Sequence, residues 1–273
     1  KVYRKQVMPM LEKGPMSIAV KIPLLNTAIY SVIRKKLLDA FGGNVDIFIV
    51  GGAPMNQETE AFLLKIKFPI TVGYGMTECA PLISFTTDDL FKAGSCGMYI
   101  KEYLDLRIDS PDPFKQVGEI LTKGMNVMDG YYNNPEASNT VLSPDGWLHT
   151  GDLGVLDPDG YLYIKGRSKS LILGPSGQNI YPEEIEDLLN AQPYIAESLV
   201  IEREGKLVAL VYPDAEAMKQ NKISREALLK IIHETRKQIN QQIPAYSQIA
   251  RIEIHDEEFE KTPKRSIKRF LYQ

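Results

Sequence analysis

The fold of the first part of the chain is decided by Val45-Asp46-Ile47-Phe48-Ile49-Val50-Gly51-Gly52-Ala53-Pro54. The β-branched and aromatic half of this stretch predicts a strand, and two glycines before a proline predict a tight turn where the strand ends. Residues 57–67 have helical composition, and residues 69–75 form a second strand-like run that ends on glycine. Strand, turn and helix in this order predict an α/β unit with parallel strands, which place ligands at their carboxyl ends.

The flanking sequence predicts the rest of the architecture. Apolar residues at spacings of three and four predict a helix over residues 18–41. Residues 94–168 contain short strand-like runs separated by turn residues, which predict a β-rich region. From Pro182 the order helix, two strands, helix, strand predicts an α+β unit, with Ser224 capping its long helix. The predicted fold class is therefore α/β plus α+β.

Composition excludes several classes of protein. The chain has 273 residues, of which 44% are hydrophobic and 25% charged, as in a soluble globular protein of about two domains. A net charge of −3, with no long block of Lys or Arg, argues against nucleic acid as a partner. Cys79 and Cys96 fit neither a disulfide scaffold nor a zinc site, so we expect a reducing, cytoplasmic location. No run reaches the roughly 18 apolar residues of a membrane span, which leaves only peripheral contact with the inner face of a membrane.

Two glycine turns contain the first candidate site residues. The missing side chains of Gly51-Gly52 would let a flat ring or a phosphate approach, although a plain tight turn is the more usual meaning of such a pair. Gly73-Tyr74-Gly75-Met76-Thr77-Glu78 combines an aromatic ring, a hydroxyl and a carboxylate, which are the parts of a nucleotide and magnesium site. A turn with a buried Tyr and a solvated Glu is an equally good interpretation of these residues.

Three later stretches contain further candidates. Asp152, in His149-Thr150-Gly151-Asp152, could accept both hydroxyls of a ribose, although an Asp that caps its own turn is more common. Gly166-Arg167-Ser168-Lys169-Ser170 could be a hinge with an Arg that clamps a ribose or phosphate, or a solvated basic linker. The basic segment 261–269 could bring cations to a phosphate or be merely solvated.

In chain order, these stretches resemble the motifs of the adenylate-forming superfamily, and most of all those of bacterial long-chain fatty acid–CoA ligases. The resemblance spans residues 51–269. Its motifs are Gly51-Gly52-Ala53-Pro54, Tyr74-Gly75-Met76-Thr77-Glu78, Lys123-Gly124 with Gly130-Tyr131-Tyr132-Asn133-Asn134-Pro135-Glu136, His149-Thr150-Gly151-Asp152, Gly166-Arg167, and Gly177-Gln178-Asn179-Ile180-Tyr181-Pro182-Glu183-Glu184-Ile185-Glu186.

The resemblance implies two domains. Residues 1–168 would be the carboxyl-terminal part of a large adenylation domain, with an α/β portion in 1–93 and a β-barrel-like subdomain in 94–168. Residues 169–273 would be a small mobile α+β lid. Because the chain begins with Lys1 and shows no signal peptide, we expect it to be a piece whose amino-terminal half is missing.

The resemblance also implies a role for each candidate residue. Thr77, Glu78 and Lys169 would be catalytic, with Thr77 on the phosphate, Glu78 on magnesium and Lys169 at the hinge. The nucleotide-binding residues would be Gly52 and Ala53 beside the adenine, Tyr74 stacked beside it, Thr77 on the phosphate, Gly73, Gly75 and Met76 in the same stretch, and Asp152 with Arg167 on the ribose. Gly177 would lie on a loop that swings toward the pantetheine of coenzyme A.

The chemistry that the resemblance implies has two steps. A fatty carboxylate attacks the α-phosphate of ATP and releases pyrophosphate, and the thiol of coenzyme A then displaces AMP. The expected cofactors and partners are thus ATP or AMP, Mg²⁺, coenzyme A and a fatty acid, together with the missing amino-terminal half.

Two departures from the family pattern lead us to expect that the chain alone is inactive. Residues 1–44 contain no Ser/Thr/Gly-rich loop with a Lys for the β- and γ-phosphates, so ATP would lose its main anion cradle. The family ends in Thr-x-x-Gly-Lys-Ile-x-Arg, whereas Ser266 stands here at the Lys position, with Lys264 and Lys268 nearby. Two alternatives stay open: an enzyme that loads a carrier protein, and a non-catalytic nucleotide-binding or interaction module.

Overall fold

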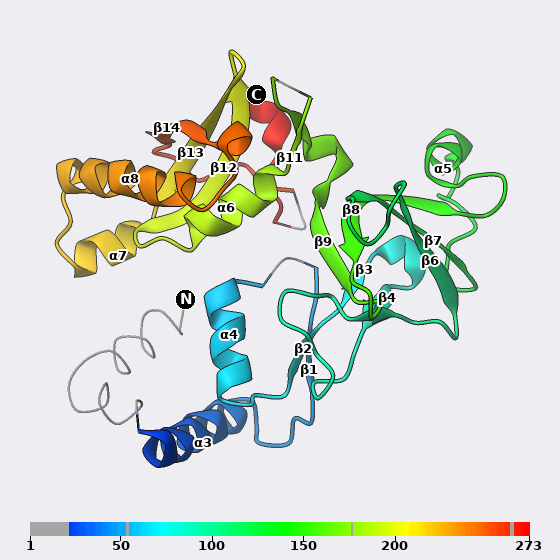
Figure 1. Cartoon of the computed structure of the whole chain (residues 1–273), viewed down its shortest axis with the longest axis horizontal. Helices are drawn as coiled ribbons and strands as arrows, with labels where there is room; N and C mark the ends of the chain where they lie inside the picture. Colours follow the sequence, from blue (N-terminus) through cyan, green and yellow to red (C-terminus); the bar gives the residue numbers. More distant parts are fainter. Residues whose placement is uncertain (1–21, 53–54, 176, 263–264) are drawn as a thin grey trace. The chain divides into compact units, whose positions relative to one another are not determined.

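A computed structural model describes residues 22–52, 55–175, 177–262 and 265–273 (Figure 1). The chain divides into two compact units. The first contains the described residues up to Arg107, with Leu121–His149 and Leu156–Tyr163, and the second contains Ile108–Ile120, Thr150–Val155 and Ile164–Gln273. The expected boundary after residue 168 falls inside the short helix η3 (Ser168–Ser170) and stays a prediction.

The first unit contains the α/β arrangement that the sequence predicts. Strands β1 (Phe48–Val50) and β2 (Ile70–Val72) pair in parallel. Helix α4 (Gln57–Lys65) connects them and is capped by Asn56, whose side chain accepts a hydrogen bond from the Thr59 amide at 3.2 Å. Helix α3 (Pro23–Ala40) precedes β1. The helices and strands share one apolar cluster: Tyr30, Ile33, Phe62, Ile66, Phe68 and Ile70.

The region from residue 74 to 167 is rich in strands, and so begins earlier than the β-rich region predicted over residues 94–168. Strands β3 (Tyr74–Gly75), β4 (Leu82–Phe85) and β5 (Met98–Tyr99) form an antiparallel sheet. A four-stranded sheet has the order β6 (Leu104–Asp109), β7 (Gly118–Gly124), β8 (Leu148–Leu156) and β9 (Leu162–Arg167). The short helices η2 (Thr77–Cys79) and α5 (Pro135–Val141) lie between strands.

The second unit contains the predicted α+β arrangement. Strands β12 (Ile195–Arg203), β13 (Lys206–Pro213) and β14 (Ile249–Ile254) form a sheet in which β13 is central, antiparallel to β12 and parallel to β14. Its helices are α6 (Pro182–Asn190), α7 (Ala215–Gln220) and α8 (Arg225–Asn240). The predicted cap of α8 is confirmed, because the Ser224 hydroxyl accepts a hydrogen bond from the Ala227 amide at 3.1 Å.

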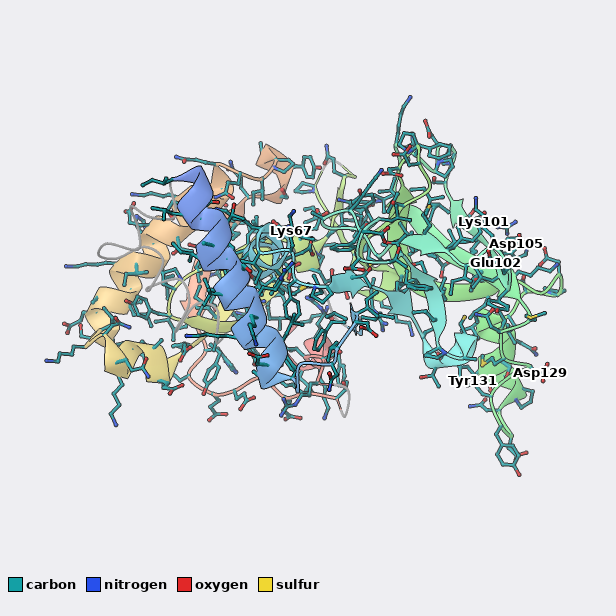
Figure 2. All side chains as sticks on the ribbon, turned by 90° about the horizontal axis from the view of Figure 1, so that it is seen from below. Lys67, Lys101, Glu102, Asp105, Asp129 and Tyr131 are labelled. Carbon is teal, nitrogen blue, oxygen red and sulfur yellow. The ribbon has the colours of Figure 1, made fainter. Side chains whose placement is uncertain are left out.

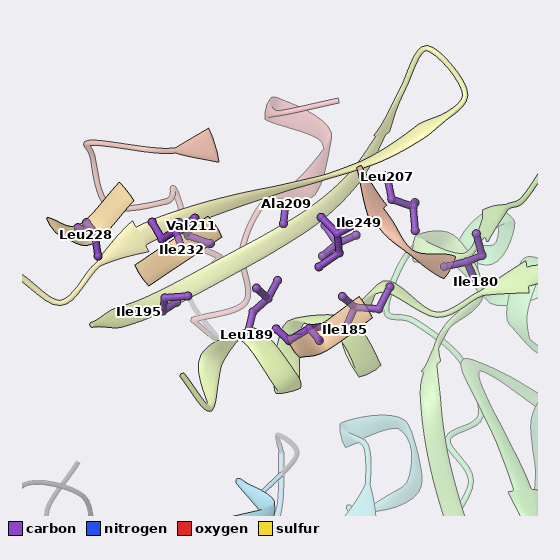
Figure 3. Packing of buried hydrophobic residues seen from close by; sticks show 12 residues of the cluster. Ile180, Ile185, Leu189, Ile195, Leu207, Ala209, Val211, Leu228, Ile232 and Ile249 are labelled. Carbon is purple, nitrogen blue, oxygen red and sulfur yellow. The ribbon is translucent and has the colours of Figure 1, made fainter. Parts of the chain in front are cut away.

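Strand β13 buries both of its faces. Leu207, Ala209 and Val211 belong to the cluster that α6 and α8 share with the sheet (Figure 3). The alternate residues Val208 and Leu210 pack instead with Phe259, Ile267 and Tyr272 of the C-terminal segment. A strand alternates its side chains between the two sides of a sheet, so the C-terminal segment is the cover of the second face.

Among the described residues, no helix has both the length and the apolar character to cross a membrane.

Candidate functional site

The two glycine turns of the first unit lie side by side. Strands β1 and β2 pair from Phe48↔Ile70 to Val50↔Val72, so both turns leave the sheet at the same end. The Gly73 amide donates to the Val50 carbonyl at 2.8 Å, and a Cβ built on Gly51 would lie 3.2 Å from the Gly73 carbonyl oxygen. Gly52 has a φ of +84°, a conformation that favours glycine. Ala53 lies outside the described residues.

The segment after Gly73 turns sharply. Tyr74 and Gly75 form β3, and a Cβ on Gly75 would lie 2.0 Å from the Pro81 carbonyl oxygen, so only glycine fits there. The Met76 amide donates to that same carbonyl at 2.8 Å. This turn leads into η2, which begins with an exposed Thr77 and a half-buried Glu78. An aromatic ring, a hydroxyl and a carboxylate thus follow one another directly after the end of the parallel strands.

The carboxylate of Glu78 has a partner that sequence analysis did not find. The Tyr131 hydroxyl donates a hydrogen bond to Glu78 Oε1 at 2.9 Å. Burial, and then the hydrogen bond and charge of Glu78, raise the pKa of Tyr131, which keeps this hydroxyl protonated as a donor. The only available signal was Tyr131 itself, inside a motif to which no role was given.

The surroundings of Glu78 fit a magnesium ion that a nucleotide carries. No cluster of three or more His, Cys, Asp or Glu side chains that could hold a metal exists among the described residues. Mg²⁺ in nucleotide sites is usually bound by one or two carboxylates and by phosphate oxygens, so a single carboxylate is sufficient.

The neighbouring Cys79 is buried, which raises its pKa to about 12 and leaves the thiol unreactive.

Asp152 and Arg167 meet in the second unit. Arg167 Nε lies 2.9 Å from Asp152 Oδ1, where the carboxylate is buried and the guanidinium is 70% exposed. Thr150 fixes the backbone beside Asp152, because its hydroxyl donates to the Ile120 carbonyl at 2.7 Å and accepts from the Asp152 amide at 3.1 Å. Glu119 contributes a contact that the sequence did not predict by accepting from the Gly151 amide at 2.9 Å. The pair combines a fixed anion with a cation that faces solvent.

The two remaining candidates of the second unit lie on connections. Lys169 is exposed in η3, beside Ser168, whose hydroxyl donates to the Gly151 carbonyl at 3.1 Å. Gly177 has a φ of +79° in the turn between β10 (Ile172–Leu173) and β11 (Asn179–Ile180). Both residues are exposed, so neither contributes to a hydrophobic core.

Ser266, which the resemblance aligns with the family's adenylation lysine, is joined by its backbone to described residues earlier in the chain. The Thr262 amide donates to the Ser266 carbonyl at 2.8 Å, and Lys261 bridges Ile267. Lys268 lies 3.2 Å from Glu260 and is therefore occupied by an ion pair, while Lys264 lies outside the described residues. The Ser266 carbonyl is therefore held by Thr262, and the placement of Ser266 at the lysine position stays a prediction.

The structure brings the candidate residues together in two groups. Gly52, Gly73 and the residues 74–78 belong to the first unit. Asp152, Arg167, Lys169 and Gly177 belong to the second.

Comparison with known families and proteins gives consistent results. The family model described as "AMP-binding enzyme" matches residues 10–132, and "AMP-binding enzyme C-terminal domain" matches residues 169–272. The chain is 33% identical over 239 residues to 4-coumarate-CoA ligase 2 of Narcissus pseudonarcissus, covering 81% of this chain and 41% of the relative. It is 33% identical over 202 residues to a long-chain-fatty-acid–CoA ligase of Gallus gallus, covering 72% of this chain and 25% of the relative.

A solved structure has the same architecture. O-succinylbenzoate coenzyme A synthetase from Bacillus subtilis, in complex with AMP, superimposes with a TM-score of 0.68 at 25% identity, covering 88% of this chain and 49% of that one. The chain spans less than half the length of the relatives described here. The relatives act on different acids, so the predicted long-chain fatty acid subtype does not follow from them. The two family matches, with the shared α/β and small C-terminal domain fold, establish that this chain belongs to the AMP-binding enzyme superfamily.

Proposed function

We propose that the full-length protein containing this chain is an ATP-dependent, AMP-forming acid–CoA ligase, and that its acid is a long-chain fatty acid. One observation supports this most strongly. Tyr74, Thr77 and Glu78 follow directly on a glycine turn that lies beside a second glycine turn, at the carboxyl ends of two parallel strands. Such an edge is where open α/β sheets bind ligands, and its side chains match a nucleotide.

In the first half reaction, a carboxylate oxygen of the acid attacks the α-phosphorus of ATP, and the bond to pyrophosphate breaks. Glu78 would hold Mg²⁺, which supplies positive charge to the crowded phosphates when bound. The Thr77 hydroxyl, exposed at the start of η2, would donate to a phosphate oxygen. Asp152 would accept the two ribose hydroxyls, and Arg167 would add a donor beside them.

In the second half reaction, the sulfur of coenzyme A attacks the acyl carbon and AMP leaves. Different groups must then surround the same acyl carbon, which a rotating small domain makes possible. Lys169, exposed in η3, is the proposed pivot, and the β10–β11 turn with Gly177 is the part that would approach the thiol. The function in this half reaction rests on the family resemblance and on the placement of these two residues in connections between strands.

The experiment is a release assay on the full-length protein. We expect pyrophosphate release with palmitate, and a thioester only when coenzyme A is present. Acetate, 4-coumarate and 2-succinylbenzoate serve as the matched acids. Release with 4-coumarate or 2-succinylbenzoate, but not with palmitate, would support the ligase activity and contradict the fatty acid substrate. No release with any acid would contradict the ligase activity itself.

Ser266 supports a second candidate, a nucleotide-binding module without catalysis. An uncharged hydroxyl cannot replace a lysine beside a phosphate, and Lys268 is paired with Glu260. This candidate predicts AMP binding without pyrophosphate release in the full-length protein. A protein that transfers its acyl group to a carrier-protein thiol, and not to coenzyme A, would be detected in the same assay by adding carrier protein. For the chain by itself, we propose no activity and no tight binding of ATP by calorimetry.

A further inference from the structure

The segment that follows β7 donates hydrogen bonds to backbone carbonyls in and after η2. Asn126 Nδ2 donates to the Cys79 carbonyl at 2.9 Å and to the Leu82 carbonyl at 3.3 Å. The Met128 amide donates to the Glu78 carbonyl at 2.8 Å. Three hydrogen bonds thus fix the backbone around Glu78. The remaining freedom of the carboxylate lies in the side-chain torsions of Glu78.

Tyr131, which is labelled in Figure 2, restricts the Glu78 side chain through its hydroxyl, and the beginning of α5 fixes the Tyr131 backbone in turn. The Tyr131 amide donates to Ser138 Oγ at 2.8 Å, and the same hydroxyl donates to the Asn134 carbonyl at 2.8 Å. The Asn134 side chain caps α5 by accepting from the Ala137 amide at 3.0 Å. A chain of hydrogen bonds therefore connects the N-terminus of α5 to the carboxylate of Glu78.

We propose that Tyr131 is a positioning residue that orients Glu78 toward the magnesium ion of the bound nucleotide. The inference rests on the proposed function, because it takes Glu78 as the magnesium ligand. The Tyr131 hydroxyl engages Oε1, so a metal would be bound through the other oxygen, in one orientation of the carboxylate. A glutamate that is free to rotate pays rotamer entropy when it binds a metal, and partners that orient a ligand are typically worth 10–100-fold in metal affinity.

The chain provides a matched control for this proposal. Tyr132 is the next residue and is 94% exposed, whereas Tyr131 is 37% exposed. Tyr131→Phe and Tyr132→Phe remove the same atom from adjacent positions. Because phenylalanine keeps the ring of Tyr131, the hydrogen bonds of residues 126–138 that do not involve the hydroxyl should survive, and the melting temperatures of both variants should match the wild type.

The test measures metal binding directly. The full-length protein is titrated with Mn²⁺ in the presence of ATP, and free Mn²⁺ is followed by electron paramagnetic resonance. We expect Tyr131→Phe to bind Mn²⁺ at least tenfold more weakly, Tyr132→Phe to bind like the wild type, and Glu78→Gln to lose the site. The same order is expected for the Mg²⁺ concentration that gives half-maximal pyrophosphate release.

Each other outcome has a distinct meaning. Equal Mn²⁺ affinity in Tyr131→Phe and the wild type, with Glu78→Gln impaired, would overturn the role of Tyr131 and leave the proposed function intact. Equal affinity in Glu78→Gln and the wild type would overturn the assignment of Glu78, and the inference with it. If Tyr131→Phe melts at a lower temperature, Ser138→Ala is the second variant, and unchanged metal affinity in it would also overturn the proposal.

Discussion

Arg269 Nη2 lies 2.5 Å from Glu186 Oε2, and both side chains are largely buried, at 20% and 11% exposure. The other oxygen of Glu186 accepts a hydrogen bond from the Val200 amide at 2.6 Å, and Arg269 Nη1 donates to the Val200 carbonyl at 3.3 Å. One ion pair therefore ties together α6, β12 and the last turn of the chain, η5 (Arg269–Leu271). The C-terminal segment is held to the second unit by charge as well as by its apolar packing.

The first prediction concerns the removal of Arg269. At pH 8, Arg269→Leu leaves a buried carboxylate without its cation, which should lower the unfolding free energy of the second unit by about 3 kcal/mol. Arg225→Leu is the control, because it breaks a pair with Asp256 in which both side chains are more than 60% exposed, and such pairs are worth about 1 kcal/mol or less. Urea unfolding followed by NMR signals of β12 and β13 measures both. Equal losses in the two variants would contradict the importance of burial.

The second prediction concerns pH. Burial raises the pKa of Glu186 from 4.5 to about 7, although Arg269 and the Val200 amide act in the opposite direction. The folded protein therefore holds this proton to a higher pH than the unfolded chain does. This proton contributes on the order of 3 kcal/mol to the free energy of unfolding of the second unit. The contribution is complete below about pH 4.5 and is lost as the pH rises through about 7.

The same NMR-detected urea unfolding, repeated between pH 4.5 and 8, measures this loss. Burial also raises the pKa of Asp187 to about 6, so Glu186→Gln should remove mainly the slope between about pH 6 and 7, whereas the exposed Glu202→Gln should keep it. A slope that is the same in Glu186→Gln and in the wild type would assign the pH dependence to other groups.

The third prediction separates chemistry from structure at Asp152. Asp152→Asn keeps the shape of the side chain but removes the charge that faces Arg167, and we expect adenylate formation in the full-length protein to fall by at least about 100-fold. The melting temperature should change little, because Arg167 is 70% exposed and the lost ion pair is weak. Asp105→Asn, at an exposed position of β6, should change neither quantity. A large fall in melting temperature with Asp152→Asn would favour a purely structural role in the turn.

The fourth prediction concerns close packing at Gly75. A Cβ at this position would lie 2.0 Å from the Pro81 carbonyl oxygen, so Gly75→Ala should destabilise the first unit by about 2–3 kcal/mol. Gly94→Ala is the comparison, since its Cβ would meet nothing within 4 Å and only its φ of +76° is unfavourable, at about 1 kcal/mol. Urea unfolding followed by NMR signals of β1 and β2 measures the difference. Equal effects would show that the turn can relax around an added methyl group.

Elements with clear periodicity were predictable from the sequence. The predicted order of helix, two strands, helix and strand after Pro182 is found in α6, β12, β13, α8 and β14, because apolar spacing and composition reflect buried surfaces. Strand β8 was missed. Its residues Thr150 and Asp152 are buried at 9% and 6% exposure, so polar side chains interrupt the apolar pattern that would have revealed a strand.

The candidate site was predictable only where local sequence determines it. The neighbouring glycine turns follow from two parallel strands, since parallel strands end at the same edge. The contact between Tyr131 and Glu78 joins positions 53 residues apart, and no pattern within either motif encodes such a pairing. The Glu119 contact with the Gly151 amide depends in the same way on how strands pair.

Arg265 stands where the family pattern, aligned on Ile267, has glycine, and its amide donates a hydrogen bond to the Thr262 carbonyl at 2.8 Å. Arg265 has a φ of +63°, a left-handed conformation that costs a side-chain-bearing residue about 1 kcal/mol or more. The residues around Arg265 are held together by the β-bridge between Lys261 and Ile267 and by the hydrogen bond from the Thr262 amide to the Ser266 carbonyl. A glycine at position 265 would adopt this backbone conformation without that cost.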